Sequence, residues 1–139
     1  MALKFAKLGA NIALIDINKE QLVESAEEIK QSTSTNIKVA IYVADVSNEQ
    51  QVEQTFNQIN KDFDGIDGLI NNAGILRDAL FVKAKDGVVS KKMSLESFQS
   101  VIDVNLTGVF LCGREASVHM IESGKGGAIV NMSSIARGG

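Results

Sequence analysis

Short β-forming runs alternate with longer helical segments along most of this 139-residue chain. The segment 52–63 repeats apolar residues every three or four positions, which is the period of an α-helix. The segments 37–43 and 128–132 are short, apolar and rich in β-branched residues. Such alternation predicts consecutive βα units, whose strands run parallel in one sheet. We therefore expect one α/β domain over residues 1–139.

The boundaries of the expected elements follow from caps and turn residues. Asn18 and Ser47 each precede a helical segment and have a glutamine three residues later, the spacing of a capping box. Ser94 is expected to begin a long helix that runs to Met120. The strands are expected at residues 11–16, 37–43, within 65–71, and at 128–132. Residues 81–92, with an Asp-Gly turn at their centre, are expected to form an inserted, exposed hairpin.

Charge and composition exclude several classes of partner. The net charge is −3, so nothing predicts binding to nucleic acid or to an anionic membrane. No apolar run approaches the ~20 residues that a membrane span needs, and the amino terminus does not have the pattern of a secretory signal. The single cysteine, Cys112, fits a reducing compartment. We expect a soluble, cytoplasmic protein.

Polar residues follow several of the predicted strands. Asn71, Asn72, Ala73 and Gly74 come directly after the apolar run 68–70. In open α/β sheets the carboxyl ends of the strands hold the ligand. Asp16 ends an earlier strand and the Ser133-Ser134 pair ends a later one, while Asn105 interrupts the long helix. Taken in their order along the chain, these four features resemble the short-chain dehydrogenase/reductase family. The resemblance covers essentially the whole chain.

The resemblance implies part of a doubly wound, Rossmann-type domain that binds NAD, with NADP as the alternative. In that family a first strand and a glycine-rich loop precede the helix that residues 2–8 would end, and a Tyr-x-x-x-Lys helix follows the serine. The first strand lies between the strands that end here at Asp16 and Asn71. We expect this chain by itself to be inactive, and the complete protein to be a homo-oligomer.

The cofactor contacts are carried over from the family's motif. Asp16 would bind the adenosine ribose and repel a 2′-phosphate, although stabilising the dipole of the following helix is the alternative and Lys19 nearby keeps NADP possible. Asp45 and Val46 would lie beside the adenine, with a role for Asp45 in capping the helix after Ser47 equally open. The turn residues match the family turn beside the cofactor: Asn72, Ala73 and Gly74. For Asn71, tying neighbouring strands together is as plausible as contact with the ligand.

Two residues are expected to act in catalysis. Ser134 matches the family serine that bonds to the substrate carbonyl, and Ser133 is the weaker candidate. Asn105 would bend its helix and hold a water in proton transfer, or serve structure alone. We assign no metal ligands. His119 is expected to cap or to be solvated near the end of the long helix, and Cys112 to be a small core residue.

The resemblance implies hydride transfer between NAD(P)H and a carbonyl or secondary alcohol. Residues 71–78 look like the 3-oxoacyl-carrier-protein reductase branch, which makes a 3-oxoacyl thioester the leading substrate. One alternative is a catalytically silent nucleotide-binding or regulatory module. A receiver-like signalling domain is disfavoured, because Asp45 lacks an acidic partner at the end of the earlier strand.

Overall fold

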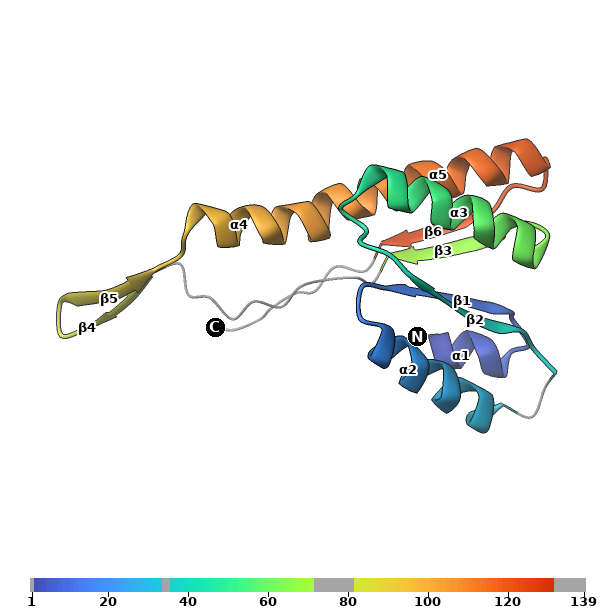
Figure 1. Cartoon of the computed structure of the whole chain (residues 1–139), viewed down its shortest axis with the longest axis horizontal. Coiled ribbons are helices and arrows are strands. Elements are labelled where there is room, and N and C mark those ends of the chain that lie inside the picture. Colours follow the sequence, from blue (N-terminus) through green and yellow to red (C-terminus); the bar gives the residue numbers. More distant parts are fainter. Residues whose placement is uncertain (1, 34–35, 72–81, 132–139) are drawn as a thin grey trace.

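A computed structural model of the chain describes residues 2–33, 36–71 and 82–131 (Figure 1). Strands and helices alternate, and the strands that connect through helices run parallel, as the sequence predicts. The elements are, in order, α1 (Ala2–Lys7), β1 (Ile12–Asp16), α2 (Lys19–Ser32), β2 (Val39–Val43), α3 (Glu49–Phe63), β3 (Gly68–Asn71), β4 (Val82–Lys85), β5 (Val88–Lys92), α4 (Leu95–Ile102), the π-helix η1 (Asp103–Thr107), α5 (Gly108–Ser123) and β6 (Ala128–Asn131).

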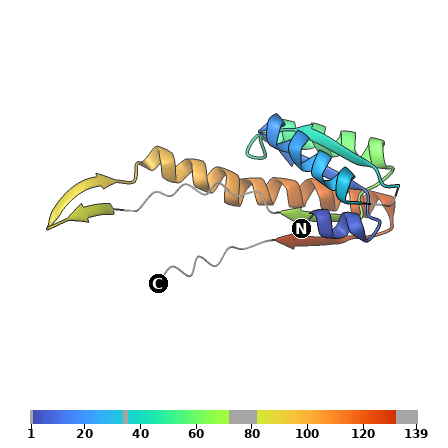
Figure 2. The ribbon, with the colours of Figure 1, turned by 90° about the horizontal axis from the view of Figure 1, so that it is seen from below.

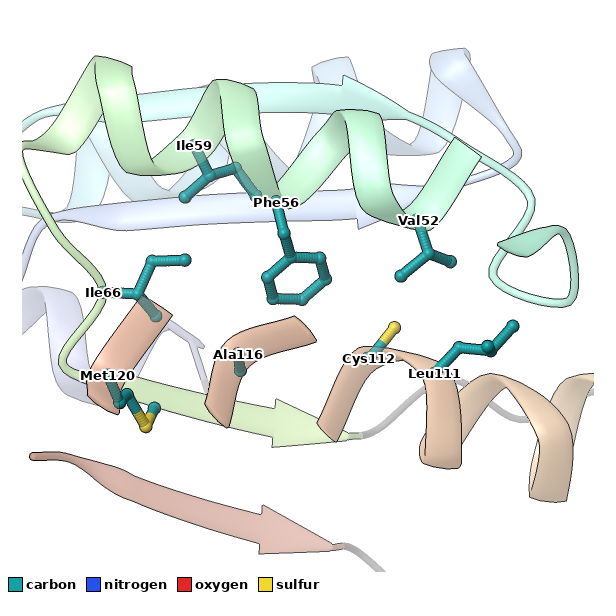
Figure 3. Close-up of a cluster of buried hydrophobic side chains, with 8 residues drawn as sticks. All are labelled: Val52, Phe56, Ile59, Ile66, Leu111, Cys112, Ala116 and Met120. Carbon is teal, nitrogen blue, oxygen red and sulfur yellow. The ribbon is translucent and has the colours of Figure 1, made fainter. Parts of the chain in front are cut away.

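The parallel strands form two separate pairs in the described part of the chain. β1 pairs with β2, and Asp16 lies opposite Val43 at their carboxyl ends. β3 pairs with β6, and Asn71 lies opposite Asn131. Figure 3 shows that all four arrows point in the same direction. The carboxyl ends of these strands therefore face the same side of the molecule.

Helices cover both faces of the β1–β2 pair. α1 and α2 pack on one face, and the cluster between α3 and α5 packs on the other (Figure 1). Side chains from β1, β2 and β3 all contact that cluster, so the same pair of helices spans both sheets. This is the helix–sheet–helix layering expected of consecutive βα units.

The core lies where α3 crosses α5 and faces the strands (Figure 3). Val52, Phe56 and Ile59 recur at helical spacing on α3 and are 1%, 2% and 6% exposed. α5 faces these residues with four buried side chains, among them the small Cys112 and Ala116. The cluster comprises Val52, Phe56, Ile59, Ile66, Leu111, Cys112, Ala116 and Met120.

The helix caps agree with the sequence at two positions and differ at one. The side chains of Asn18 and Ser94 cap α2 and α4, as predicted. The prediction that Ser47 caps α3 is wrong, because Asn48 does so by accepting a hydrogen bond from Gln51 N. The Ser47 hydroxyl instead donates a hydrogen bond to the Asp45 carboxylate within the turn.

The segment 82–92 forms a hairpin that projects from the body of the molecule (Figures 1 and 2). Asp86 and Gly87 both have positive φ, 54° and 76°, which defines the two-residue turn typical of tight hairpins. α4 continues from the hairpin toward the body, and no residue between 82 and 107 is buried. The expectation that this hairpin is an insertion stays a prediction.

Candidate functional site

Asp16 lies at the turn between β1 and α2. Its Oδ1 accepts a hydrogen bond from the backbone N of Asn18 at 3.1 Å, and Asn18 in turn caps α2. This bond shapes the turn directly before α2, and both roles predicted for Asp16 stay predictions. The carboxylate is only partly buried, so it remains open to a ligand at the strand end.

Asp45 organises the turn after β2. Its Oδ1 accepts hydrogen bonds from the backbone N of Ser47 at 3.0 Å and from the Ser47 hydroxyl at 2.6 Å. Its own backbone N donates to Gln51 Oε1 at 2.9 Å, which ties the turn to α3. One carboxylate oxygen therefore holds the loop. The prediction that Asp45 caps the following helix is not realised, because Asn48 caps α3, and the ligand role of Asp45 stays a prediction.

Val46 connects this turn to the long helix. A Cβ added to Gly108 would lie 2.7 Å from Val46 Cγ2, a separation that real Cβ atoms essentially never show. Gly108 therefore lets the turn approach the helix three residues after Asn105. The sequence contains no local signal for this contact, because it depends on residues that are far apart in the chain.

Asn105 lies in η1, the π-helical turn between α4 and α5. Its side chain is exposed, and it makes an interaction within the structure. The sequence predicts a bend at this asparagine, and the structure contains an irregular turn of five residues there. Turns of this kind occur frequently at functional sites.

Asn71 and Asn131 join the carboxyl ends of β3 and β6. Asn71 is 8% exposed, and its Nδ2 donates to Asn131 Oδ1 at 2.8 Å. This bond supports the strand-tying role considered for Asn71. Sequence reasoning did not single out Asn131, although its polar side chain at a strand end was the available signal. The predicted residues Asn72, Ala73, Gly74, Ser133 and Ser134 lie outside the described residues.

Two residues on α5 belong to the core. Cys112 is 5% exposed, as predicted, and burial raises the pKa of its thiol to about 11. The thiol is therefore protonated at neutral pH and a poor nucleophile. The prediction of a capping or solvated His119 is wrong, because this side chain is 9% exposed beside Met120 on the inner face of α5.

In the described ranges, no three histidine, cysteine or acidic side chains lie close enough to hold a metal ion. Over the same residues, no helix combines the length and the apolar character that crossing a bilayer requires. The candidate site is the carboxyl end of the parallel strands. Asp16 and Asn71 end β1 and β3, and Asp45 and Val46 follow β2. Gly108 links the turn at Val46 to the helix that carries Asn105.

Comparison with known proteins gives a consistent result. The sequence model of the family described as short chain dehydrogenase matches residues 1–138. A 3-oxoacyl-[acyl-carrier-protein] reductase from Synechocystis sp. is 38% identical over 136 residues, which cover 97% of this chain and 50% of that protein. A 2,5-dichloro-2,5-cyclohexadiene-1,4-diol dehydrogenase from Sphingobium indicum is 37% identical over 128 residues, which cover 92% of this chain and 46% of that protein.

A solved structure extends the likeness to three dimensions. The crystal structure of NAD+-bound xylitol dehydrogenase matches with a TM-score of 0.81 and 32% identity, over 99% of this chain and 49% of that one. The chain spans about half the length of the curated relatives that it matches.

Proposed function

Because the chain belongs to the short-chain dehydrogenase family, we propose that it forms the NAD-binding part of an oxidoreductase. The complete protein would transfer a hydride between NAD(P)H and a carbonyl or secondary alcohol. The observation that carries this proposal is the shared strand edge, where Asp16, Asp45 and Asn71 follow parallel strands that point the same way. Ligands of open α/β sheets bind at this edge.

The residues at the edge fit a dinucleotide. One oxygen of the Asp16 carboxylate shapes the β1–α2 turn, and the other has no hydrogen bond among the described residues. That oxygen would accept from the adenosine ribose and would repel a 2′-phosphate, which favours NAD over NADP. Val46 and the Asp45 turn would border the adenine, and their position is held by Gly108 and Gln51.

A bound nicotinamide would supply or accept the hydride, and the chain's own residues would orient the substrate. Asn71 and Asn131 join the carboxyl ends of β3 and β6, so these two strand ends lie next to each other. We assign Asn72, Ala73 and Gly74 to the cofactor side and Ser134 to the substrate carbonyl, which its hydroxyl would polarise. Asn105 would contribute to proton transfer from the π-helical turn.

The substrate proposed is a 3-oxoacyl thioester. Its support is the sequence 71–78 and the 38% identity to a 3-oxoacyl-[acyl-carrier-protein] reductase.

The strand order also fits the family. β1–β2 and β3–β6 form separate pairs, and in the family another strand lies between these two pairs.

The test is a chimaera in which this chain replaces the matching half of the Synechocystis reductase. We expect the chimaera to use NADH with a higher kcat/KM than NADPH, and Asp16→Ala to remove that preference. Ser134→Ala should lower kcat by ~10²-fold or more, as for loss of one oriented hydrogen-bond donor. Ser133→Ala is the matched control and should have much less effect. Equal use of both cofactors would contradict the role of Asp16, and NADH binding without turnover would favour the silent module.

A further inference from the structure

The turn that follows β2 divides its polar groups among three side chains. Asn48 accepts a hydrogen bond from Gln51 N and caps α3. The Ser47 hydroxyl donates to Oδ1 of Asp45, and the Gln51 side chain accepts from the backbone N of Asp45. Because Asn48 serves the helix, the Asp45 carboxylate is released from helix capping, which is the usual competing role of an aspartate in front of a helix.

Gln51 reaches further back along the chain than a capping box requires. In a capping box the side chain three residues after the cap accepts from the backbone N–H of the cap residue itself. Here the backbone N of Asn48 already donates to the Asp45 carbonyl oxygen at 3.0 Å. Gln51 Oε1 instead accepts from the backbone N of Asp45 at 2.9 Å, three residues before the cap. The first turn of α3 therefore restrains the backbone of Asp45 directly.

These contacts leave one oxygen of the Asp45 carboxylate for a ligand. Oδ1 accepts from the backbone N and the hydroxyl of Ser47, at 3.0 and 2.6 Å. Oδ2 has no hydrogen bond among the described residues, and Asp45 is only partly buried. An ionised carboxylate accepts hydrogen bonds and donates none. Oδ2 is therefore suited to an N–H donor, and it repels a carbonyl oxygen.

The rest of the turn is held independently of Gln51. Val46 rests on Gly108 at the start of α5, where an added Cβ would lie 2.7 Å from Val46 Cγ2. Glu49, the first residue of α3, pairs with Arg114 of α5 at 3.0 Å. Loss of the Gln51 side-chain bond would therefore free the Asp45 backbone while α3 stays against α5.

We propose that Gln51 is a positioning residue for base recognition, which acts by restraining Asp45. This inference rests on the proposed function, in which the Asp45 turn borders the adenine. Adenine carries an exocyclic amino group that Oδ2 can accept from, whereas hypoxanthine has a carbonyl oxygen in the same place. A fixed carboxylate therefore selects adenine and rejects hypoxanthine. Without the Gln51 bond the carboxylate turns more freely, so both the affinity for adenine and the rejection of hypoxanthine decrease.

The test is a titration of the reductase chimaera with NADH and with reduced nicotinamide hypoxanthine dinucleotide, followed by nicotinamide fluorescence. The unsubstituted chimaera should bind NADH more tightly by about tenfold or more, because the analogue replaces a donor by an acceptor. Gln51→Leu removes the acceptor at similar size and should reduce this ratio by about threefold or more, through weaker NADH binding. In turnover it should raise KM for NADH with little change in kcat. Gln51→Glu keeps an acceptor and should preserve the ratio.

Two further variants make the test specific. Gln50→Leu is the matched control, because it makes the same chemical change one position earlier, at an exposed side chain without a hydrogen bond among the described residues. It should leave the ratio unchanged. In Asp45→Asn the backbone N of Ser47 retains the amide oxygen, so the amide NH₂ group replaces Oδ2. This variant should shift the preference toward the hypoxanthine dinucleotide.

The outcomes separate this inference from the proposed function. A chimaera that binds neither dinucleotide would overturn both. Equal binding of the two dinucleotides would overturn base selection by Asp45 and leave hydride transfer intact. A preference for NADH that disappears in Asp45→Asn but persists in Gln51→Leu would overturn the role of Gln51 alone. An equal loss in Gln50→Leu would also overturn it, because the effect would then come from the helix in general.

Discussion

α3 and α4 are both amphipathic helices that begin at a side-chain cap, yet only α3 contributes to the core. α3 buries Val52, Phe56 and Ile59 against α5, whereas Phe98 on α4 remains 50% exposed and Leu95 77% exposed. The difference lies in what each helix faces. α3 returns along β2 and meets α5, and α4 extends from the body toward the hairpin (Figure 1).

This comparison separates two sources of order in the molecule. The body is held by apolar burial, in which each large side chain contributes about 1.5–3 kcal/mol. The arm, formed by the hairpin β4–β5 and α4, is held in the described part of the chain by local signals, namely the Asp86-Gly87 turn and the Ser94 cap. Changes in the body should therefore alter the free energy of unfolding, while equivalent changes in the arm should not.

The largest effect is expected from a matched pair of phenylalanines. Phe56→Ala should lower the free energy of unfolding by about 3–5 kcal/mol, because it removes a ring that is 2% exposed in the core. Phe98→Ala makes the same chemical change on α4 and should cost less than about 1 kcal/mol. Urea unfolding measures both losses. Equal losses would show that α4 is part of the cooperative unit.

The next effect distinguishes two glycines of α5. A Cβ at Gly108 collides with Val46, so Gly108→Ala should destabilise the chain by about 1–3 kcal/mol. Gly113→Ala, where a Cβ meets nothing within 4 Å, should instead stabilise it by about 0.5–1 kcal/mol through better helix propensity. The double variant Gly108→Ala/Val46→Ala should recover much of the loss. If the double variant stayed as unstable as Gly108→Ala, the clash with Val46 would not be the cause of the lost stability.

A smaller effect compares the caps of α3 and α4. Asn48→Ala removes the hydrogen bond to Gln51 N and should cost about 1 kcal/mol of global stability. Ser94→Ala removes the corresponding bond to Ser97 N, but it should leave the global unfolding midpoint unchanged, because α4 is outside the core. Hydrogen exchange should show the second loss locally, as faster exchange in α4 alone. If Ser94→Ala lowered the midpoint of global unfolding as Asn48→Ala does, α4 would not be independent of the core.

The smallest effect concerns the ionisation of Tyr42 on β2. Burial, and then the hydrogen bond of its hydroxyl to Asp62 Oδ2 at 2.7 Å, raise the pKa of Tyr42 well above the ordinary value of about 10. Since the folded-state pKa is raised, this contribution to stability is complete below pH ~10 and is lost as the pH rises toward the folded-state pKa. Tyr42 is the only tyrosine, so its titration can be followed by tyrosinate absorbance.

Two variants of the network check this interpretation. Asp62→Asn should move the pKa of Tyr42 part of the way back, because burial remains while the carboxylate is lost. Tyr42→Phe should remove the alkaline loss of stability from this group. An ordinary pKa for Tyr42 in the folded chain would show that β2 and the end of α3 are not held together as described.

Much of the candidate site was accessible from the sequence because it consists of strand ends. Asp16 and Asn71 were placed by the alternation of strands and helices, and the structure has them as the last residues of β1 and β3. The Ser47 cap was misplaced by one residue, because two side chains competed and the Asp45 carboxylate bound the serine hydroxyl. His119 was expected to be solvated because it lies near the end of the long helix. It is buried because the inner face of α5 still packs against the protein at that point.

The sequence by itself determined the local order of this protein. Periodicity, caps and the Asp-Gly turn depend on residues within a few positions of one another, so they can be recognised without the fold. Tertiary structure alone decided which amphipathic face is buried, that Val46 rests on Gly108, and that Asn71 bonds to Asn131 sixty positions away. Those contacts depend on distances in space between segments that the local sequence does not relate.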